Sequence, residues 1–162
     1  MAIEVANRQR LVTVAHQELA GLARNVILEI GAPLGICGTA DLVIAIVRSK
    51  QMRRLNSRFR GKNVDTDVLS FPAGQEYNPG CDSYLGDVVI CADVAFRQAA
   101  EAGLSIDREI AELVIHGVLH LAGFDHDVDN GEMNRLELKL RRRLLNSKAP
   151  ATVVDARGRS RL

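Results

Sequence analysis

The sequence predicts a single α/β (α+β) domain with a small mixed sheet of about four strands flanked by helices. The chain has 162 residues, which is enough for one hydrophobic core and too few for two. Short apolar, β-branched runs alternate along it with longer amphipathic stretches, a pattern typical of strands and helices in one domain. Only 4% of the residues are aromatic, so aliphatic side chains must build the core. We expect this domain to span residues 1–146, and residues 147–162 to form a flexible basic tail.

The first half of the chain is expected to hold three strands and two helices. In chain order these are a strand at 3–7, a helix from Thr13 to Ile30, a strand from Asp41 to Val47, a short basic helix from Ser49 to Arg58, and a strand from Asp67 to Phe71. Gly31, Pro33 and Gly35 are expected to end the first helix, and Gly61 to close the second.

The second half is expected to begin with a loop at 73–84 and a buried strand at 86–92. Three helices should follow, from Asp93 to Ala102, from Ser105 to Ala122 and from about Asp129 to Leu145. Asp93 and Ser105 are the expected N-terminal caps of the first two helices, because short polar side chains accept hydrogen bonds from exposed backbone amides. Gly103 and Gly123 are expected to follow the C-terminal ends of the same two helices.

Several protein classes are excluded by composition. No apolar run is long enough to span a bilayer, and the N-terminus lacks a signal-peptide pattern. The three cysteines, Cys37, Cys81 and Cys91, form no CxxC pair, which indicates reduced thiols and no disulfide framework. We therefore expect a cytoplasmic protein with no membrane partner.

Basic residues are clustered although the net charge is only +1. The segment from Arg48 to Lys62 has seven basic residues and no acidic one, and the segment from Lys139 to Leu162 has eight against one. Such runs are commonly solvated faces or tails, and for the C-terminal run that interpretation is at least as good as a functional one. Two runs on a near-neutral chain nevertheless favour an anionic partner, with RNA or DNA as the obvious candidate.

The clearest chemical signal is the stretch HGVLHLAGFDH, which holds three of the four histidines. His116 and His120 are four residues apart in a predicted helix, so their side chains share one face. A left-handed turn at Gly123 would bring His126 back toward them. Three neutral imidazoles leave a fourth tetrahedral position open, which is typical of a catalytic zinc site. The alternative is three unrelated histidines with local hydrogen bonds; the isolated His16 receives no role.

The spacing of these histidines also occurs in a large class of zinc peptidases. Those enzymes carry a glutamate directly after the first histidine, as the general base. Here that position is Gly117, so peptide hydrolysis becomes the second choice. A glutamate introduced at Gly117 would complete the peptidase motif in the sequence, but we expect no useful gain of peptidase activity. We also expect lower RNA cleavage, because the added carboxylate would lie where an anionic phosphate must approach.

Three motifs in the same order resemble the bacterial YbeY endoribonucleases. They are HGVLHLAGFDH, LNSRFRGKNVDTDVLSFP at 55–72 and LGDVVICADVA at 85–95. The resemblance implies a zinc-dependent, single-strand-specific endoribonuclease that acts in maturation of small-subunit (16S) ribosomal RNA and in ribosome quality control. It also implies ribosomal RNA, the small subunit or its assembly factors as partners. One departure is Asp65, which stands where the family commonly has proline.

By this resemblance the metal ligands are His116, His120 and His126, which would hold one Zn²⁺ per chain on the long helix of the C-terminal half. We take His116 and Arg60 as catalytic. A zinc ion makes bound water acidic enough to supply hydroxide near neutral pH, which fits the missing glutamate. Arg60 suits stabilisation of transition-state charge, because a guanidinium donates two parallel hydrogen bonds to phosphate oxygens.

Four further basic residues are expected to hold RNA phosphates without reading sequence: Arg53, Arg54, Arg58 and Lys62. Asp125 and Asp127 flank the last histidine; either could fix an imidazole tautomer. Equally, Asp125 could stabilise the turn and Asp127 could start the final helix, and we favour the structural role for Asp127. For Asp67 and Ser70, packing or turn roles are favoured.

Two other functions remain open at this point. One is a zinc hydrolase of another class, most simply a peptidase with a different base. The other is a ribosome assembly factor whose metal mainly holds the fold together.

Overall fold

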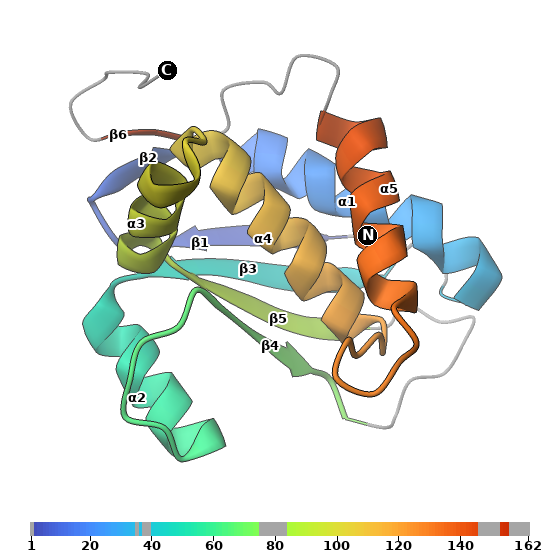
Figure 1. The fold of residues 1–162 in the computed structure, drawn as a ribbon, viewed down its shortest axis with the longest axis horizontal. Coiled ribbons are helices and arrows are strands. Elements are labelled where there is room, and N and C mark those ends of the chain that lie inside the picture. Colours follow the sequence, from blue (N-terminus) through green and yellow to red (C-terminus); the bar gives the residue numbers. More distant parts are fainter. Residues whose placement is uncertain (1, 35, 37–39, 75–83, 146–152, 156–162) are drawn as a thin grey trace.

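The computed structural model describes residues 2–34, 36, 40–74, 84–145 and 153–155. Its main sheet has four strands in the order β1-β3-β5-β4 (Figure 1). Their bounds are Ile3–Asn7 for β1, Asp41–Val47 for β3, Val68–Pro72 for β4 and Tyr84–Cys91 for β5. β1 and β5 both run parallel to β3, whereas β4 runs antiparallel to β5 at one edge. The predicted mixed four-stranded sheet is confirmed.

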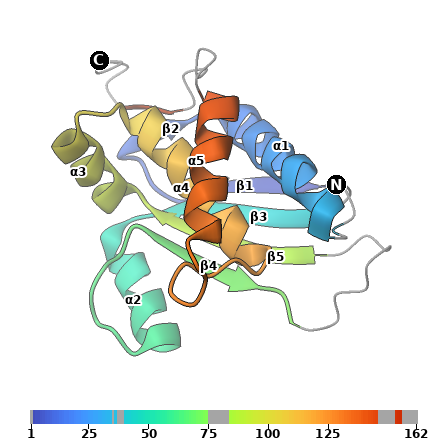
Figure 2. The ribbon, with the colours of Figure 1, turned by 45° about the vertical axis from the view of Figure 1, so that its right-hand side comes forward.

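Within the described residues, five helices cover the sheet (Figures 1 and 2). They are α1 (His16–Leu34), α2 (Ser49–Arg60), α3 (Ala92–Ala102), α4 (Ile106–Leu121) and α5 (Glu132–Leu145). Alternate residues of the central strands enter two different hydrophobic clusters: Val88 and Ile90 pack with α1, α4 and α5, whereas Val89 packs with Met52 of α2. The sheet is therefore buried on both faces, as its continuous apolar runs predict.

The first helix differs from its predicted bounds at both ends. Thr13 lies in a short strand, β2 (Val12–Val14), and α1 begins only at His16. β2 pairs antiparallel with β6 (Val153–Asp155), a partner about 140 residues away that no local pattern could indicate. At its other end α1 continues through Gly31 and Pro33, and the Ile36 amide donates to the Gly31 carbonyl at 2.9 Å.

The C-terminal stretch also departs from its prediction in part. Of the proposed tail at 147–162, the structure describes residues 153–155, and these form β6. The remainder of that tail, and residues 75–83 of the predicted loop before β5, lie outside the described residues. No helix in the described part of the chain is long and apolar enough to cross a membrane.

The helix starts show which capping predictions were correct. Ser105 caps α4 as predicted, with its hydroxyl accepting from the Arg108 amide at 3.1 Å. Asp93 is not a cap: Cys91 occupies the N-cap of α3, and the Asp93 carboxylate accepts from Arg48 and from the Ser49 amide at the start of α2. The hydrogen bond from Arg48 holds the pKa of Asp93 below its usual range. Asp93 thus joins two helices, a long-range role that its position in the sequence does not reveal.

Helix α4 packs closely against the sheet at Gly117. A Cβ atom at Gly117 would lie 2.5 Å from Cγ1 of Val88 and 3.4 Å from the Ser70 hydroxyl oxygen. That hydroxyl donates a hydrogen bond of 3.0 Å to the Gly117 carbonyl, which ties β4 to α4. Position 117 faces the sheet, so a glutamate there would first have to displace Val88, and the expectation that its carboxylate would meet an approaching phosphate stays a prediction.

Gly117→Ala should destabilise the protein by about 1–3 kcal/mol, because the added methyl group must displace packed atoms of Val88. Chemical denaturation measures the change. Gly21→Ala is the matched control, since nothing lies within 4 Å of its new Cβ in α1, and helix propensity should stabilise it by up to about 1 kcal/mol.

A double variant separates steric overlap from other effects. Val88→Ala removes both colliding methyl groups, so its combination with Gly117→Ala should lose less stability than the sum of the two single losses. Equal stabilities of Gly117→Ala and the wild type would contradict the close approach.

Candidate functional site

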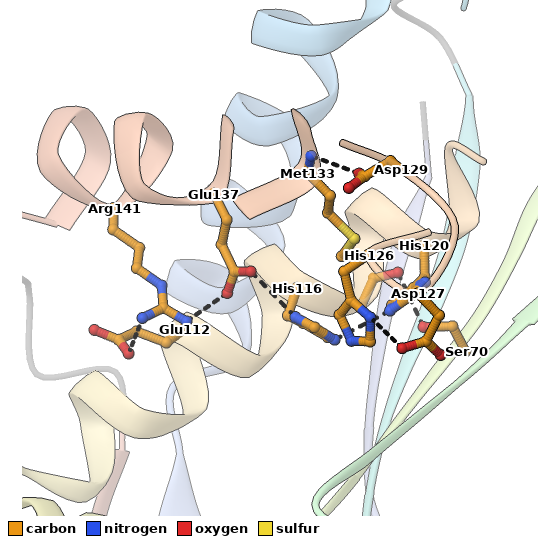
Figure 3. A network of polar contacts seen from close by, with 11 residues as sticks. Ser70, Glu112, His116, His120, His126, Asp127, Asp129, Met133, Glu137 and Arg141 are labelled. Atoms are coloured by element: carbon orange, nitrogen blue, oxygen red, sulfur yellow. Dashed lines mark hydrogen bonds and ion pairs between the residues drawn. The ribbon is translucent and has the colours of Figure 1, made fainter. Parts of the chain in front are cut away.

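The three predicted histidines lie together at the C-terminal end of α4 (Figure 3). His116 and His120 occupy successive turns of the helix, with their Nε2 atoms 3.1 Å apart. Gly123 then adopts the expected left-handed conformation, with φ of 93°, and its amide donates to the His120 carbonyl at 3.0 Å. The following loop returns His126, whose ring centroid is 5.5 Å from that of His116 and 5.3 Å from that of His120.

These imidazoles fit a transition-metal ion chemically. One ring nitrogen from each histidine lies within 4.8 Å of the others. Burial lowers the pKa of His120, and the neighbouring His116 and His126 lower it further, which favours the neutral form that metal binding requires. Cys91, the one cysteine among the described residues, is buried on the far side of the sheet beside Ser49. The site could therefore hold a metal through nitrogen donors, and its occupation by zinc stays a prediction.

Glu137 of α5 contacts the imidazole ring of His116 at Nδ1. Its Oε2 lies 3.2 Å from Nδ1 of His116, and its side chain is only 9% exposed. With Nδ1 donating to this carboxylate, the Nε2 lone pair of His116 is left facing His120. Burial alone raises the pKa of Glu137, but the hydrogen bond with His116 and the charge of Arg141 outweigh it, so the pKa lies below the usual range.

Ion pairs extend this contact along the helices (Figure 3). Arg141 bonds the second oxygen of Glu137 and also reaches Glu112 of α4 at 2.8 Å. Glu112 in turn accepts from Arg108 at 2.7 Å. The buried carboxylate of Glu137 and the partly buried one of Glu112 are thus both paired, which makes their burial tolerable. These contacts fasten α5 to α4 directly behind the histidines.

Sequence reasoning missed Glu137, although a signal for it exists. Met133 and Leu140 are buried on the apolar face of α5, and Glu137 lies four residues after the first and three before the second. A carboxylate on that face must be buried, and a buried carboxylate needs a partner. The pattern indicates a buried acid on α5; the partner histidine, 21 residues away, becomes visible only in the fold.

The histidines open into a pocket of about 330 Å³, within the range of small ligand sites. Arg60, from the last turn of α2, lines the same pocket. The walls also include residues of β4 and of the segment before it: Thr66, Asp67, Val68, Ser70 and Pro72. A guanidinium and three imidazoles therefore meet in one cavity, contributed by opposite faces of the sheet.

The other predicted basic residues lie elsewhere on α2. Arg53, Arg54 and Arg58 line a separate surface hollow, together with Lys50, Ser57 and Asn63. Lys62 is exposed but lines neither the hollow nor the histidine pocket. The structure therefore brings Arg60 to the histidines and leaves the other predicted RNA-binding residues outside that pocket.

The two aspartates beside His126 have distinct contacts. Asp125 stabilises the turn by accepting from the Asp127 amide at 3.0 Å. Asp127 does not start the final helix, because α5 begins at Glu132, after a turn in which Asp129 accepts from the Gly131 and Met133 amides. Instead, Oδ1 of Asp127 lies 3.1 Å from Nδ1 of His126. Both aspartates also line the pocket.

Comparisons with known proteins match this chain throughout the domain. The family model described as Endoribonuclease YbeY matches residues 4–146. The Endoribonuclease YbeY of Koribacter versatilis is 45% identical over 112 residues, which cover 69% of this chain and 68% of that protein. The Endoribonuclease YbeY of Thermodesulfovibrio yellowstonii is 31% identical over 159 residues, covering 93% and 99%. The solution structure of TM1509 from Thermotoga maritima, 26% identical, superposes with a TM-score of 0.56 over 86% of this chain and 87% of that one.

Glu137→Gln should weaken Zn²⁺ binding about 10- to 100-fold, because the neutral amide no longer holds a charge-assisted bond to His116. Competition with a zinc chelator measures the affinity, and far-ultraviolet circular dichroism monitors the fold. Glu132→Gln makes the same charge change at an exposed position of the same helix and should bind Zn²⁺ like the wild type. Equal affinities of Glu137→Gln and Glu132→Gln would contradict the positioning role.

Proposed function

This chain belongs to the endoribonuclease YbeY family, and from that premise we propose that it is a zinc-dependent endoribonuclease for single-stranded RNA. We further propose that it acts in maturation of 16S ribosomal RNA and in ribosome quality control, in the cytoplasm, with the small subunit or its assembly factors as partners. The observation that carries the proposal is the shared pocket of three histidines and Arg60. We assign the catalytic unit to residues 1–146.

His116, His120 and His126 would hold the zinc ion, since imidazole nitrogens suit zinc and no cysteine among the described residues lies near them. When bound, the ion supplies Lewis-acid chemistry by polarising phosphoryl oxygens and making water more acidic. Glu137 fixes the orientation of His116 from outside the pocket. His116 and Arg60 are the residues to which we assign catalysis.

Arg60 would bind the scissile phosphate. Its planar guanidinium donates two parallel hydrogen bonds to phosphate oxygens, and these strengthen as charge accumulates in the transition state. The pocket also presents the carboxylates of Asp67, Asp125 and Asp127, which can accept a proton there. The chain thus provides phosphate binding and proton acceptors around the metal site.

The basic surface of α2 would hold the flanking strand. Arg53, Arg54, Arg58 and Lys62 are all exposed, so they can reach phosphates without reading bases. Arg60 at the end of the same helix joins this surface to the pocket. RNA bound along α2 would therefore lead toward the histidines.

The two alternative functions have less support. A peptidase would need a base after His116, but position 117 faces Val88 and is not part of the pocket wall. For an assembly factor with a structural metal, the fold should depend on the ion. The sheet, however, is joined to α1, α4 and α5 by an extensive cluster of buried aliphatic side chains, which supports a fold that does not depend on the ion.

Arg60→Lys should lose about 100-fold or more in cleavage rate at saturating single-stranded RNA, because an ammonium group cannot replace the paired hydrogen bonds. Its zinc content and thermal stability should stay normal. Arg97→Lys, at an exposed position of α3, is the control and should cleave like the wild type. Cleavage is measured on a single-stranded RNA and on the same sequence in a duplex.

Near-normal cleavage by Arg60→Lys would show that a simple positive charge suffices. If the zinc-loaded wild type cleaves neither RNA, while chelation unfolds it, the assembly-factor alternative should replace the nuclease. Cleavage of peptides with none of RNA would instead restore the peptidase.

A further inference from the structure

An exposed aromatic ring lies directly beside Arg60. Phe59, in the last turn of α2, keeps 57% of its surface exposed. The chain has only four phenylalanines, two tyrosines and no tryptophan. Single exposed hydrophobic side chains are common, but this ring lies next to a proposed catalytic residue and is accessible to a bound ligand.

The ring of Phe59 is held in place from the sheet. Phe71 of β4 meets it edge-on, with ring centroids 5.0 Å apart and planes at 66°. Phe71 itself is partly buried against the cluster that contains Met52 and Leu69. On another side, the guanidinium carbon of Arg58 lies 5.4 Å from the centroid of Phe59. Phe71 therefore supports the exposed ring from the sheet, and a cation lies over one face of the ring.

This aromatic pair lies between the two sites that would handle RNA. Arg60 lines the histidine pocket, as do Ser70 and Pro72 on either side of Phe71. Arg58, whose guanidinium lies over the ring of Phe59, lines the basic hollow. β4 is the edge strand, and Figure 2 shows α2 on that side of the sheet. A single-stranded RNA that runs from the basic hollow to the histidine pocket would pass Phe59 at this edge of the sheet.

We propose that Phe59, supported by Phe71, stacks against an unpaired base of the bound RNA. This inference rests on the proposed nuclease function and names how it would select single strands. Stacking on an aromatic ring tolerates any base, because every base has a π-face, and the neighbouring arginines match the phosphates in charge. A base inside a duplex is already stacked on both faces and is unavailable to the ring. The occupant is thus a single-stranded nucleic acid.

Phe59→Trp provides a direct optical test, because it creates the only tryptophan in the chain. Titration with a short oligouridine should quench its emission, whereas an abasic oligonucleotide of equal length and charge should leave it unchanged. Leu28→Trp is the matched control on α1, since Leu28 is 55% exposed, and neither ligand should change its emission. Electrophoresis verifies that the oligonucleotide stays intact during the titration.

Affinity provides a second readout that does not depend on the tryptophan variant. Phe59→Leu keeps an apolar contact with Phe71 but loses the flat ring, so its affinity for oligouridine should fall roughly 5-fold or more, with none lost for the abasic strand. Phe59→Tyr should retain wild-type affinity. Thermal unfolding checks that all variants are folded.

Four outcomes would overturn the proposal. Equal responses to the normal and abasic strands would show that charge alone is recognised. Emission that changes with protein concentration in the absence of RNA would show that a second copy of the chain covers the ring. If RNA binding is salt-dependent and cleavage is normal but the emission of the Phe59→Trp variant does not change, only the stacking role is excluded. If the protein binds no RNA at all, the nuclease function is excluded as well.

Discussion

The close contact between α4 and the sheet at Gly117 is the constraint on which the site depends. The absence of a side chain lets the helix settle against Val88, and the Ser70 hydroxyl fixes it to β4 through the Gly117 carbonyl. His116 precedes this contact and His120 follows it by one turn. Because β4 is also the strand beside the end of α2, the same contact brings the histidines into one pocket with Arg60.

A second set of contacts makes the geometry of the histidines depend on α5. Glu137 reaches His116, and Arg141 ties Glu137 to Glu112 of α4. Charges buried in this way are tolerated only when each has a partner, so the loss of one member leaves another unpaired. The loop that carries His126 lies between these two helices, with Gly123 and Asp129 setting its turns. The histidine cluster therefore lies where two helices joined by ion pairs meet.

The sequence predicted those parts of the fold that local patterns determine. The strand at Asp41–Val47, the Ser105 cap and the left-handed Gly123 agree with the structure residue for residue. β2 was not predicted, because a three-residue strand exists only through its distant partner β6.

In the candidate site, too, some features follow from local sequence patterns and others only from long-range packing. The grouping of the histidines could be read from their helical spacing, whereas the contacts of Asp93, Asp127 and Glu137 depend on which elements pack together. Only the family resemblance singles out Arg60 in the sequence, since nothing in a run of basic residues distinguishes the one that lines a pocket.

The proposed function depends on metal coordination by the three histidines. The most direct measurement is zinc X-ray absorption, with metal analysis, on the protein purified without added metal. We expect about one zinc per chain, with three imidazole nitrogens at about 2.0–2.1 Å and no sulfur ligand. Loss of the bound zinc in His116→Ala should accompany this result. A sulfur ligand, or zinc retained in full by His116→Ala, would contradict the assignment.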